Sequence, residues 1–242
     1  MKKLATYINE KLVLNKNTFK KRELKYFPKT KEELKDIIKQ LIKERMDDPV
    51  IDLNDIDTSE ITDMTELFEK TDIKKINISE WDVSNVKEMA FMFYQCENLT
   101  DIGDISRWNV SEVETISYMF SNCSNLKSIS DLSSWNVSKV KYMLSMFADC
   151  TKLKYIDGIS EWNVSKVENF NGMFKNCINL ESIGNISRWK VSKVKYIYEM
   201  FMNCKNLKYV GDLSGWDISR VTDMGRMFYG SRIINIPSWY KN

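Results

Sequence analysis

Five cysteines carry the most reactive side chains of this sequence, and they recur at an interval of 27 residues. They are Cys96, Cys123, Cys150, Cys177 and Cys204. Thiolates can act as nucleophiles or bind metal ions, but none of these residues lies in a CxxC pair, and zinc normally needs four converging ligands. Five thiols in one row, all pointing the same way, cannot all pair. We therefore interpret the cysteines as small buried residues, which suits a reducing compartment.

Other routes to catalysis also find little support in the sequence. The 242 residues include no histidine, which removes Ser-His and Cys-His nucleophile pairs and histidine metal ligands. Serines at equivalent repeat positions have no base partner, which indicates a structural role. They are Ser59, Ser84, Ser111, Ser138, Ser165, Ser192 and Ser219. There is also no Gly-rich phosphate loop and no nucleophile elbow. We predict that the protein is not an enzyme and uses no cofactor or metal.

The large apolar residues keep the same period as the cysteines. Tryptophans stand 27 residues apart at Trp81, Trp108, Trp135, Trp162, Trp189 and Trp216. Met-Phe pairs end at Phe93, Phe120, Phe147, Phe174, Phe201 and Phe228. A fixed period of this length is typical of a solenoid, in which each repeat forms one coil and buries its apolar face against its neighbours. We expect Trp, Met and Phe to fill the core.

One repeat shows how a coil is expected to be built. Residues 99–106 read as a strand with a kink at Gly103, and residues 108–113 read as a second extended segment. Residues 114–123, which carry a Met-Phe pair, are predicted to form a short helix or 3₁₀ turn. Coils stacked about 4.8 Å apart in parallel register turn each repeated position into a ladder. The predicted fold is therefore a repeat solenoid of parallel β coils with short helical turns.

The chain is predicted to have three parts. Residues 1–27 form a basic docking or tether segment, residues 28–50 an amphipathic capping helix, and residues 51–242 a solenoid of about seven coils. Thr30 and Glu33 have the spacing of a capping box, and Leu34, Ile38 and Leu41 follow at helical spacing. Solenoid ends expose apolar coil surface and need a covering element with a polar outer face. We expect the helix to be that element.

Charge and hydropathy limit which binding partners and which cellular compartment are expected. Residues 1–50 carry 14 basic and 8 acidic residues, whereas residues 51–242 carry 22 and 26, so the solenoid is not a basic body and nucleic-acid binding is not favoured. No run of about 18 apolar residues is present, which predicts no membrane insertion. The first residues also lack the apolar core of a secretory signal. We expect a cytoplasmic or virion-associated protein, displayed on a cell surface only if the N-terminus was trimmed.

Candidate partner-binding residues stand where the repeat varies while the core stays constant. One row, after the repeated serine, is expected to form a basic stripe of Lys139, Lys166, Lys193 and Arg220. A second row follows the repeated leucine and consists of Lys127, Lys154, Tyr155, Lys208 and Tyr209. Its tyrosines are of a residue type enriched at binding hot spots. The competing interpretation is a solvated face with nearby acids such as Glu168 and Asp223.

The repeat unit resembles the BspA-like, leucine-rich-repeat-related family of bacterial surface proteins, and the same repeat type appears in lipoproteins of wall-less bacteria. The resemblance rests on Trp135-Asn136-Val137-Ser138, Met146-Phe147 and Cys150 with their copies, over about residues 51–242. It implies a right-handed solenoid used for adhesion or protein binding, with no catalytic residues. The chain departs from the family because it has no signal peptide and no lipidation cysteine near its start.

The opening residues 1–15 are similar to N-terminal segments of gut bacteriophage proteins. That similarity suits an intracellular or virion-associated protein with a docking peptide. Three functional hypotheses follow from the sequence. The first is a non-enzymatic scaffold that binds a protein partner. The second is a structural or virion-associated assembly component docked through residues 1–27. The third is nucleic-acid binding through the basic stripe.

Overall fold

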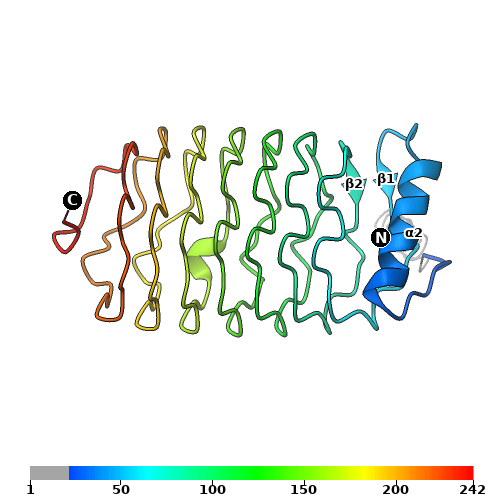
Figure 1. Ribbon diagram of the computed structural model, residues 1–242, viewed down its shortest axis with the longest axis horizontal. Coiled ribbons are helices and arrows are strands. Elements are labelled where there is room, and N and C mark those ends of the chain that lie inside the picture. Colours follow the sequence, from blue (N-terminus) through cyan, green and yellow to red (C-terminus); the bar gives the residue numbers. More distant parts are fainter. Residues whose placement is uncertain (1–21, 242) are drawn as a thin grey trace, which may run out of the picture.

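A computed structural model describes residues 22–241, which wind into successive coils stacked along one axis (Figure 1). Helix α2 (Lys31–Glu44) lies at the N-terminal end of the stack. Strands β1 (Ile51–Asp52) and β2 (Ile76–Asn77) pair in parallel, and a 3₁₀ helix, η1 (Ile159–Glu161), lies further along the chain. The predicted repeat solenoid is present. Its strands are far shorter than predicted, because most of the coil-to-coil pairing consists of isolated parallel bridges.

The core consists of ladders that the repeat period lines up. The repeated tryptophans are only 2–4% exposed, and each indole N–H donates to a backbone carbonyl of the preceding coil, as Trp135 does to Ile105 at 3.0 Å. The phenylalanine rings are stacked nearly parallel, with centroids 5.6 Å apart between Phe120 and Phe147. This confirms that Trp, Met and Phe fill the core. Such stacked aromatic pairs add to the burial of apolar area.

The five cysteines lie buried beside these aromatic ladders, as predicted. Each thiol donates to the carbonyl of a phenylalanine one coil earlier, for example Cys150 to Phe120 at 3.0 Å. Burial raises the pKa of the Cys96 thiol to about 11 and that of Cys204 to about 12. Because the thiolate is the reactive form, these side chains are inert near neutral pH.

The segments that carry the Met-Phe pairs are not helical, which corrects the prediction for residues 114–123. We call them the turn segments; together they form the turn column. They span residues 63–70, 88–95, 115–122, 142–149, 169–176, 196–203 and 223–230. Two residues in each have positive φ, for example Tyr118 (58°) and Asn122 (62°). A left-handed residue ends any right-handed helix, so each segment is a run of tight turns instead.

At the corner after most of the repeated tryptophans, a side chain accepts a hydrogen bond from the backbone. The repeated serines do not cap the turn after tryptophan with their hydroxyls. The residue two positions earlier accepts from the serine N–H, as Asn136 Oδ1 does from Ser138 N at 3.2 Å. This is an Asx turn, in which a short side chain replaces a backbone acceptor. The predicted kink at Gly103 is confirmed by its φ of +76°.

Helix α2 begins at the predicted capping box. The Thr30 hydroxyl accepts from Glu33 N at 3.2 Å, and the Glu33 carboxylate accepts from the backbone N–H of Lys29 at 2.6 Å. Leu34, Ile38 and Leu41 are buried in the same core cluster as the first coils. Hydrophobic contact therefore holds the helix against the array, and the two capping hydrogen bonds stabilise its first turn.

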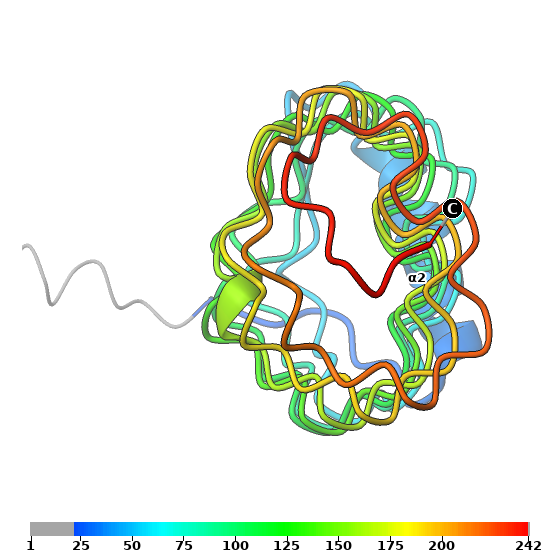
Figure 2. The same cartoon turned by 90° about the vertical axis from the view of Figure 1, so that its left-hand side faces the viewer.

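The segment predicted as a tether lies mostly outside the described residues. Its last part contacts the array, because Tyr26 forms a parallel bridge with Ile56 and its carbonyl accepts from Asp57 N at 2.8 Å. At the other end of the stack, the C-terminal residues run inside the outline of the last coil (Figure 2). The Trp239 indole donates to the Leu213 carbonyl at 2.9 Å there, and Tyr240 packs edge-on against Phe228.

Candidate binding surface

The predicted basic stripe lies on one side of the turn column, and we call this side the upstream flank. It consists of Lys139, Lys166, Lys193 and Arg220, all exposed. The positions two residues later are joined coil to coil, as Glu168 N donates to Lys141 O at 2.8 Å. The four cations therefore stand in one column. Lys139 is neutralised by Glu112 at 2.6 Å, whereas the other three have no ion pair among residues 22–241.

A column of alternating charge runs beside the upstream flank. Lys141 pairs with Glu114 at 2.6 Å, and Lys195 pairs with Glu168 at 2.8 Å. Hydrogen bonds from the two lysines lower the pKa of Glu114 and of Glu168. Exposed pairs of this kind contribute little to stability. Their main effect here is to cancel charge in the neighbouring column, so the excess positive charge lies on the flank itself.

The second predicted row lies after the turn segments, and we call it the downstream flank. It consists of Lys127, Lys154, Tyr155, Lys208 and Tyr209, all exposed. The Glu181 carboxylate contacts two of them. Lys154 lies 3.6 Å from it, and the Tyr155 hydroxyl donates to it at 2.7 Å. This hydrogen bond raises the pKa of Tyr155. Lys208 lines a shallow cavity of about 460 Å³ with Glu181, Asn206 and Arg232. The downstream flank therefore has a mixed charge.

The structure does not join the two predicted rows into one site. Within each coil the turn segment separates them along the chain, as residues 142–149 separate Lys139 from Lys154. Among the described residues, no hydrogen bond or ion pair connects a side chain of one flank with a side chain of the other. The two flanks are therefore separate surfaces.

Two exposed tyrosines that were not among the predicted site residues lie beside the upstream flank. Tyr142 and Tyr196 are 45% and 41% exposed and directly follow the paired lysines Lys141 and Lys195. They belong to one column of parallel bridges, with Asn169 between them. The sequence signal was the string Lys-Val-Lys-Tyr, which occurs at residues 139–142 and again at residues 193–196. Exposed tyrosine beside unpaired cations is a common composition of interface hot spots.

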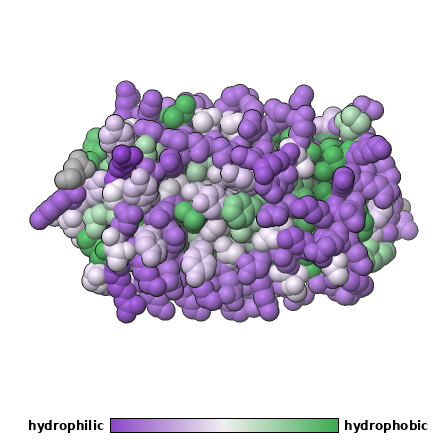
Figure 3. Space-filling model, viewed as in Figure 1, coloured by the Kyte–Doolittle hydropathy of each residue, from purple (hydrophilic) through white to green (hydrophobic). Residues whose placement is uncertain are grey.

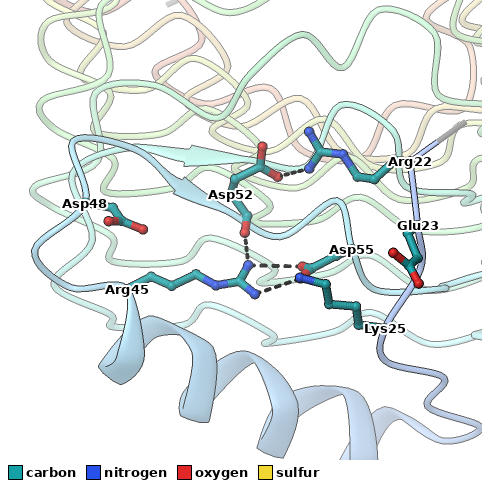
Figure 4. A pocket seen from close by; sticks show the side chains of 7 residues that line it. All are labelled: Arg22, Glu23, Lys25, Arg45, Asp48, Asp52 and Asp55. Carbon is teal, nitrogen blue, oxygen red and sulfur yellow. Dashed lines mark hydrogen bonds and ion pairs between the residues drawn. The ribbon is translucent and has the colours of Figure 1, made fainter. Parts of the chain in front are cut away.

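A concavity lined by charged residues lies where helix α2 meets the first coil (Figure 4). Its volume is about 540 Å³, and its lining residues are Arg22, Glu23, Lys25, Arg45, Asp48, Asp52 and Asp55. The Arg45 guanidinium donates to both carboxylate oxygens of Asp55, at 3.0 and 2.7 Å, and to the carbonyl of Asp52. Arg22 pairs with the Asp52 carboxylate. These charges compensate one another and join Arg45, at the end of α2, to Asp52 and Asp55 in the first coil. We call this cluster the clamp on α2.

Within residues 22–241, no group of three or more His, Cys, Asp or Glu side chains could hold a metal ion. The side shown in Figure 3 is mainly hydrophilic, with scattered apolar groups. None of the helices described is long and apolar enough to cross a membrane.

The repeats match a known protein family along most of the chain. The family is described as "Mycoplasma protein of unknown function, DUF285", and its model matches residues 38–156 and 124–239. The chain belongs to this family. Membership in the DUF285 family confirms the predicted resemblance to BspA-like, leucine-rich-repeat-related repeats.

Other comparisons add little to the DUF285 match. No curated protein matches the chain. Among solved structures, the crystal structure of a leucine-rich repeat protein of T. pallidum is similar, with 20% sequence identity and a TM-score of 0.43. The similarity covers 67% of this chain and 68% of that chain.

Proposed function

We propose that the protein is a non-enzymatic scaffold that binds a protein partner through its upstream flank. The observation that carries this proposal is the column of Lys166, Lys193 and Arg220, three exposed cations without an ion pair in the described part of the chain. Unpaired charge on a rigid surface speeds association and selects partners of complementary charge. The family match supports this coarse role, because leucine-rich-repeat-like arrays present long surfaces for interaction.

The partner expected on this flank is a folded protein with an acidic patch. Tyr142 and Tyr196 supply aromatic contact area beside the cations, and the alternating Lys-Glu column offers both donors and acceptors at the rim. Arginine and tyrosine are enriched among residues that dominate binding energy. The downstream flank offers Tyr209 and Lys208 but lies beside Glu181, so its net charge is smaller. We therefore place the main contact on the upstream flank.

The experiment compares three baits in a lysate of the source cells. The first is the wild-type chain, and the second carries Lys166→Gln, Lys193→Gln and Arg220→Gln. The third carries Lys35→Gln, Lys39→Gln and Lys43→Gln on the exposed side of α2, which removes the same charge elsewhere. We expect a protein retained by the wild type and the helix variant and lost from the flank variant. Equal retention by all three baits would reject the upstream flank.

A further inference from the structure

The backbone hydrogen bonds between neighbouring turn segments all run in the same direction along the stack. In each turn segment four alternate N–H groups donate to four carbonyls of the next segment, at distances from 2.8 to 3.2 Å. In the segment 142–149, for example, Met143 N donates to Asn169 O at 3.1 Å and Asp149 N donates to Lys175 O at 2.8 Å. The pattern repeats across six successive pairs of coils. The turn column thus has an N–H end and a carbonyl end, unlike a β-sheet, whose strand dipoles alternate and largely cancel.

One column beside the turn segments runs the other way. There Lys141 N donates to the carbonyl of Glu114, and Lys195 N donates to that of Glu168, each at 2.8 Å toward the preceding coil. A second reversed column lies on the downstream side, where Glu181 N donates to Lys154 O at 2.8 Å. These two columns are outnumbered by the four in the turn segments. Aligned peptide groups give partial negative charge at the carbonyl end and partial positive charge at the N–H end. The carbonyl end of the turn column faces the N-terminus of the array, and the N–H end faces its C-terminus.

A cation of helix α2 lies beside the carbonyl end. Lys31, in the first turn of α2, lies 3.3 Å from the Asp63 carboxylate and donates to the Thr65 hydroxyl, in the first turn segment. The helix also buries Leu34, Ile38 and Leu41 against the array. Helix α2 therefore covers this end with both a cation and an apolar face.

The N–H end is open in the described part of the chain. Met224, Arg226, Phe228 and Gly230 stand where earlier segments donate to a following coil, yet their N–H groups have no acceptor among residues 22–241. The corresponding donors one coil earlier are all satisfied, as Glu199 N is by Gly225 O at 3.0 Å. Arg226 and Gly230 have φ of +56° and +69°, and both residues are exposed. Backbone N–H groups beside such left-handed residues form concavities that bind anions.

A cavity adjoins this row of donors. Its volume is about 390 Å³, and its lining includes Phe228, Ile236, Tyr240, Arg226 and Lys241. Ile236 is 49% exposed, and the neighbouring Tyr229 is 63% exposed. The cavity therefore combines apolar walls with two cations directly beside the open donors; of these, Arg226 also lies 3.7 Å from the Glu199 carboxylate.

We propose that this C-terminal edge binds an acidic peptide segment of another protein. The carboxylates of the peptide accept from the row of N–H groups and from Arg226 and Lys241, and an apolar side chain beside them fills the cavity. Charge-assisted hydrogen bonds to backbone N–H groups are stronger than neutral ones. This site is separate from both flanks and does not depend on the function proposed for them.

Two other occupants fit the edge poorly. A second copy of the chain, placed edge to edge, would set N–H groups against N–H groups. An ordinary β-strand offers N–H and carbonyl groups together along each edge, so its own donors would face the donor row. A segment that presents carboxylates offers acceptors alone, which is what the edge lacks.

The test uses the complete chain labelled with ¹⁵N and a blocked hexapeptide of alternating aspartate and leucine. We expect saturable shifts of the Arg226 and Gly230 amide signals, and none for Glu199 and Asn203, which hold the same positions one coil earlier. Arg226→Asn combined with Lys241→Gln should weaken binding about tenfold, since it removes both side-chain cations. Asparagine is chosen because it tolerates positive φ. Lys193→Gln combined with Arg220→Gln is the matched charge control and should leave the affinity within about twofold.

Three results would overturn the proposal. The first is the absence of saturable shifts at residues 226 and 230. The second is equal binding of a peptide in which asparagine replaces aspartate, or of inorganic phosphate alone, because either would remove the need for an acidic peptide. The third is loss of hexapeptide binding in the control variant that combines Lys193→Gln with Arg220→Gln. That result would place the site on the upstream flank. The bait experiment on the flanks can fail without affecting any of these readouts.

Discussion

The turn column and the upstream flank differ in what the repeat keeps constant. In the turn column large apolar side chains return at the same positions in every coil, and alternate backbone N–H groups of every segment except the last donate to the next segment. On the flank the residue changes from Glu112 to Lys139 and Arg220, and three consecutive cations lack an ion pair among the described residues. Stability therefore comes from the ladders, whereas the flank is free to vary, as the proposed binding role requires.

The first prediction breaks a ladder at its centre. Phe147→Ala removes a fully buried ring stacked on two neighbours, and should cost about 3–5 kcal/mol in free energy of unfolding. Phe228→Ala, at the last rung, should cost less because Phe228 stacks on Phe201 alone within its ladder. Urea denaturation of both variants measures the difference. Equal costs would show that the ladder does not act as a stack.

The second prediction concerns the clamp on α2. Arg45→Ala should cost about 1–3 kcal/mol, because it removes two hydrogen bonds from the largely buried Asp55 carboxylate and leaves Lys25, 3.9 Å away, as its cationic neighbour. Burial raises the pKa of Asp55, but the hydrogen bonds from Arg45 outweigh it, and the net pKa is lowered. The stabilisation should therefore be complete above about pH 3.9 and fall as the pH drops through the lowered folded-state pKa. Unfolding measured against pH should show this loss in the wild type and not in Asp55→Asn.

The third prediction tests the left-handed positions of the turn column. Asn122 has a φ of 62°, which asparagine and glycine tolerate and β-branched residues do not. Asn122→Val should cost about 1–2 kcal/mol, whereas Asn122→Gly should change stability by only a few tenths. Thermal unfolding of the two variants gives the comparison. A helical turn at this place would predict the reverse order, with glycine the worse substitution.

The smallest effect on stability is expected on the flank. The combined change Lys166→Gln, Lys193→Gln and Arg220→Gln removes three exposed charges without a partner in the described chain, and should alter the free energy of unfolding by less than about 0.5 kcal/mol. Thermal unfolding at low and moderate salt measures it. A large loss would mean that the cations stabilise the array, and would weaken the case that they serve binding.

The period predicted the coils and their core, but not how the chain turns within a coil. Apolar residues at intervals of three, as in Val113, Ile116 and Met119, suit a helical turn as well as a run of tight turns. The deciding feature is a positive φ at residues such as Tyr118 and Glu199, which are not glycine. Hydrogen bonds to the adjacent coil hold these residues in that conformation. A tertiary cause of this kind leaves no mark in the local sequence.

The ion pairs of the candidate surface were predictable where oppositely charged residues stand one repeat, 27 residues, apart. The pairing of Lys139 with Glu112 follows from an offset of 27 residues, and so does that of Lys195 with Glu168. The separation of the two flanks depends on the path of the turn segment, which was predicted to be a short helix or 3₁₀ turn. The open donors at Arg226 and Gly230 were not predictable, because they follow from hydrogen bonds seen only in the folded array.

The central claim is that a partner uses the upstream flank while the ladders beneath it remain unchanged. Amide hydrogen exchange of the protein, with and without the partner retained by the wild-type bait, tests it most directly. We predict slower exchange in residues 139–142 and 193–196 and unchanged exchange in residues 146–149, which lie within the turn column. Protection confined to the downstream flank, or to residues 223–230, would contradict the claim.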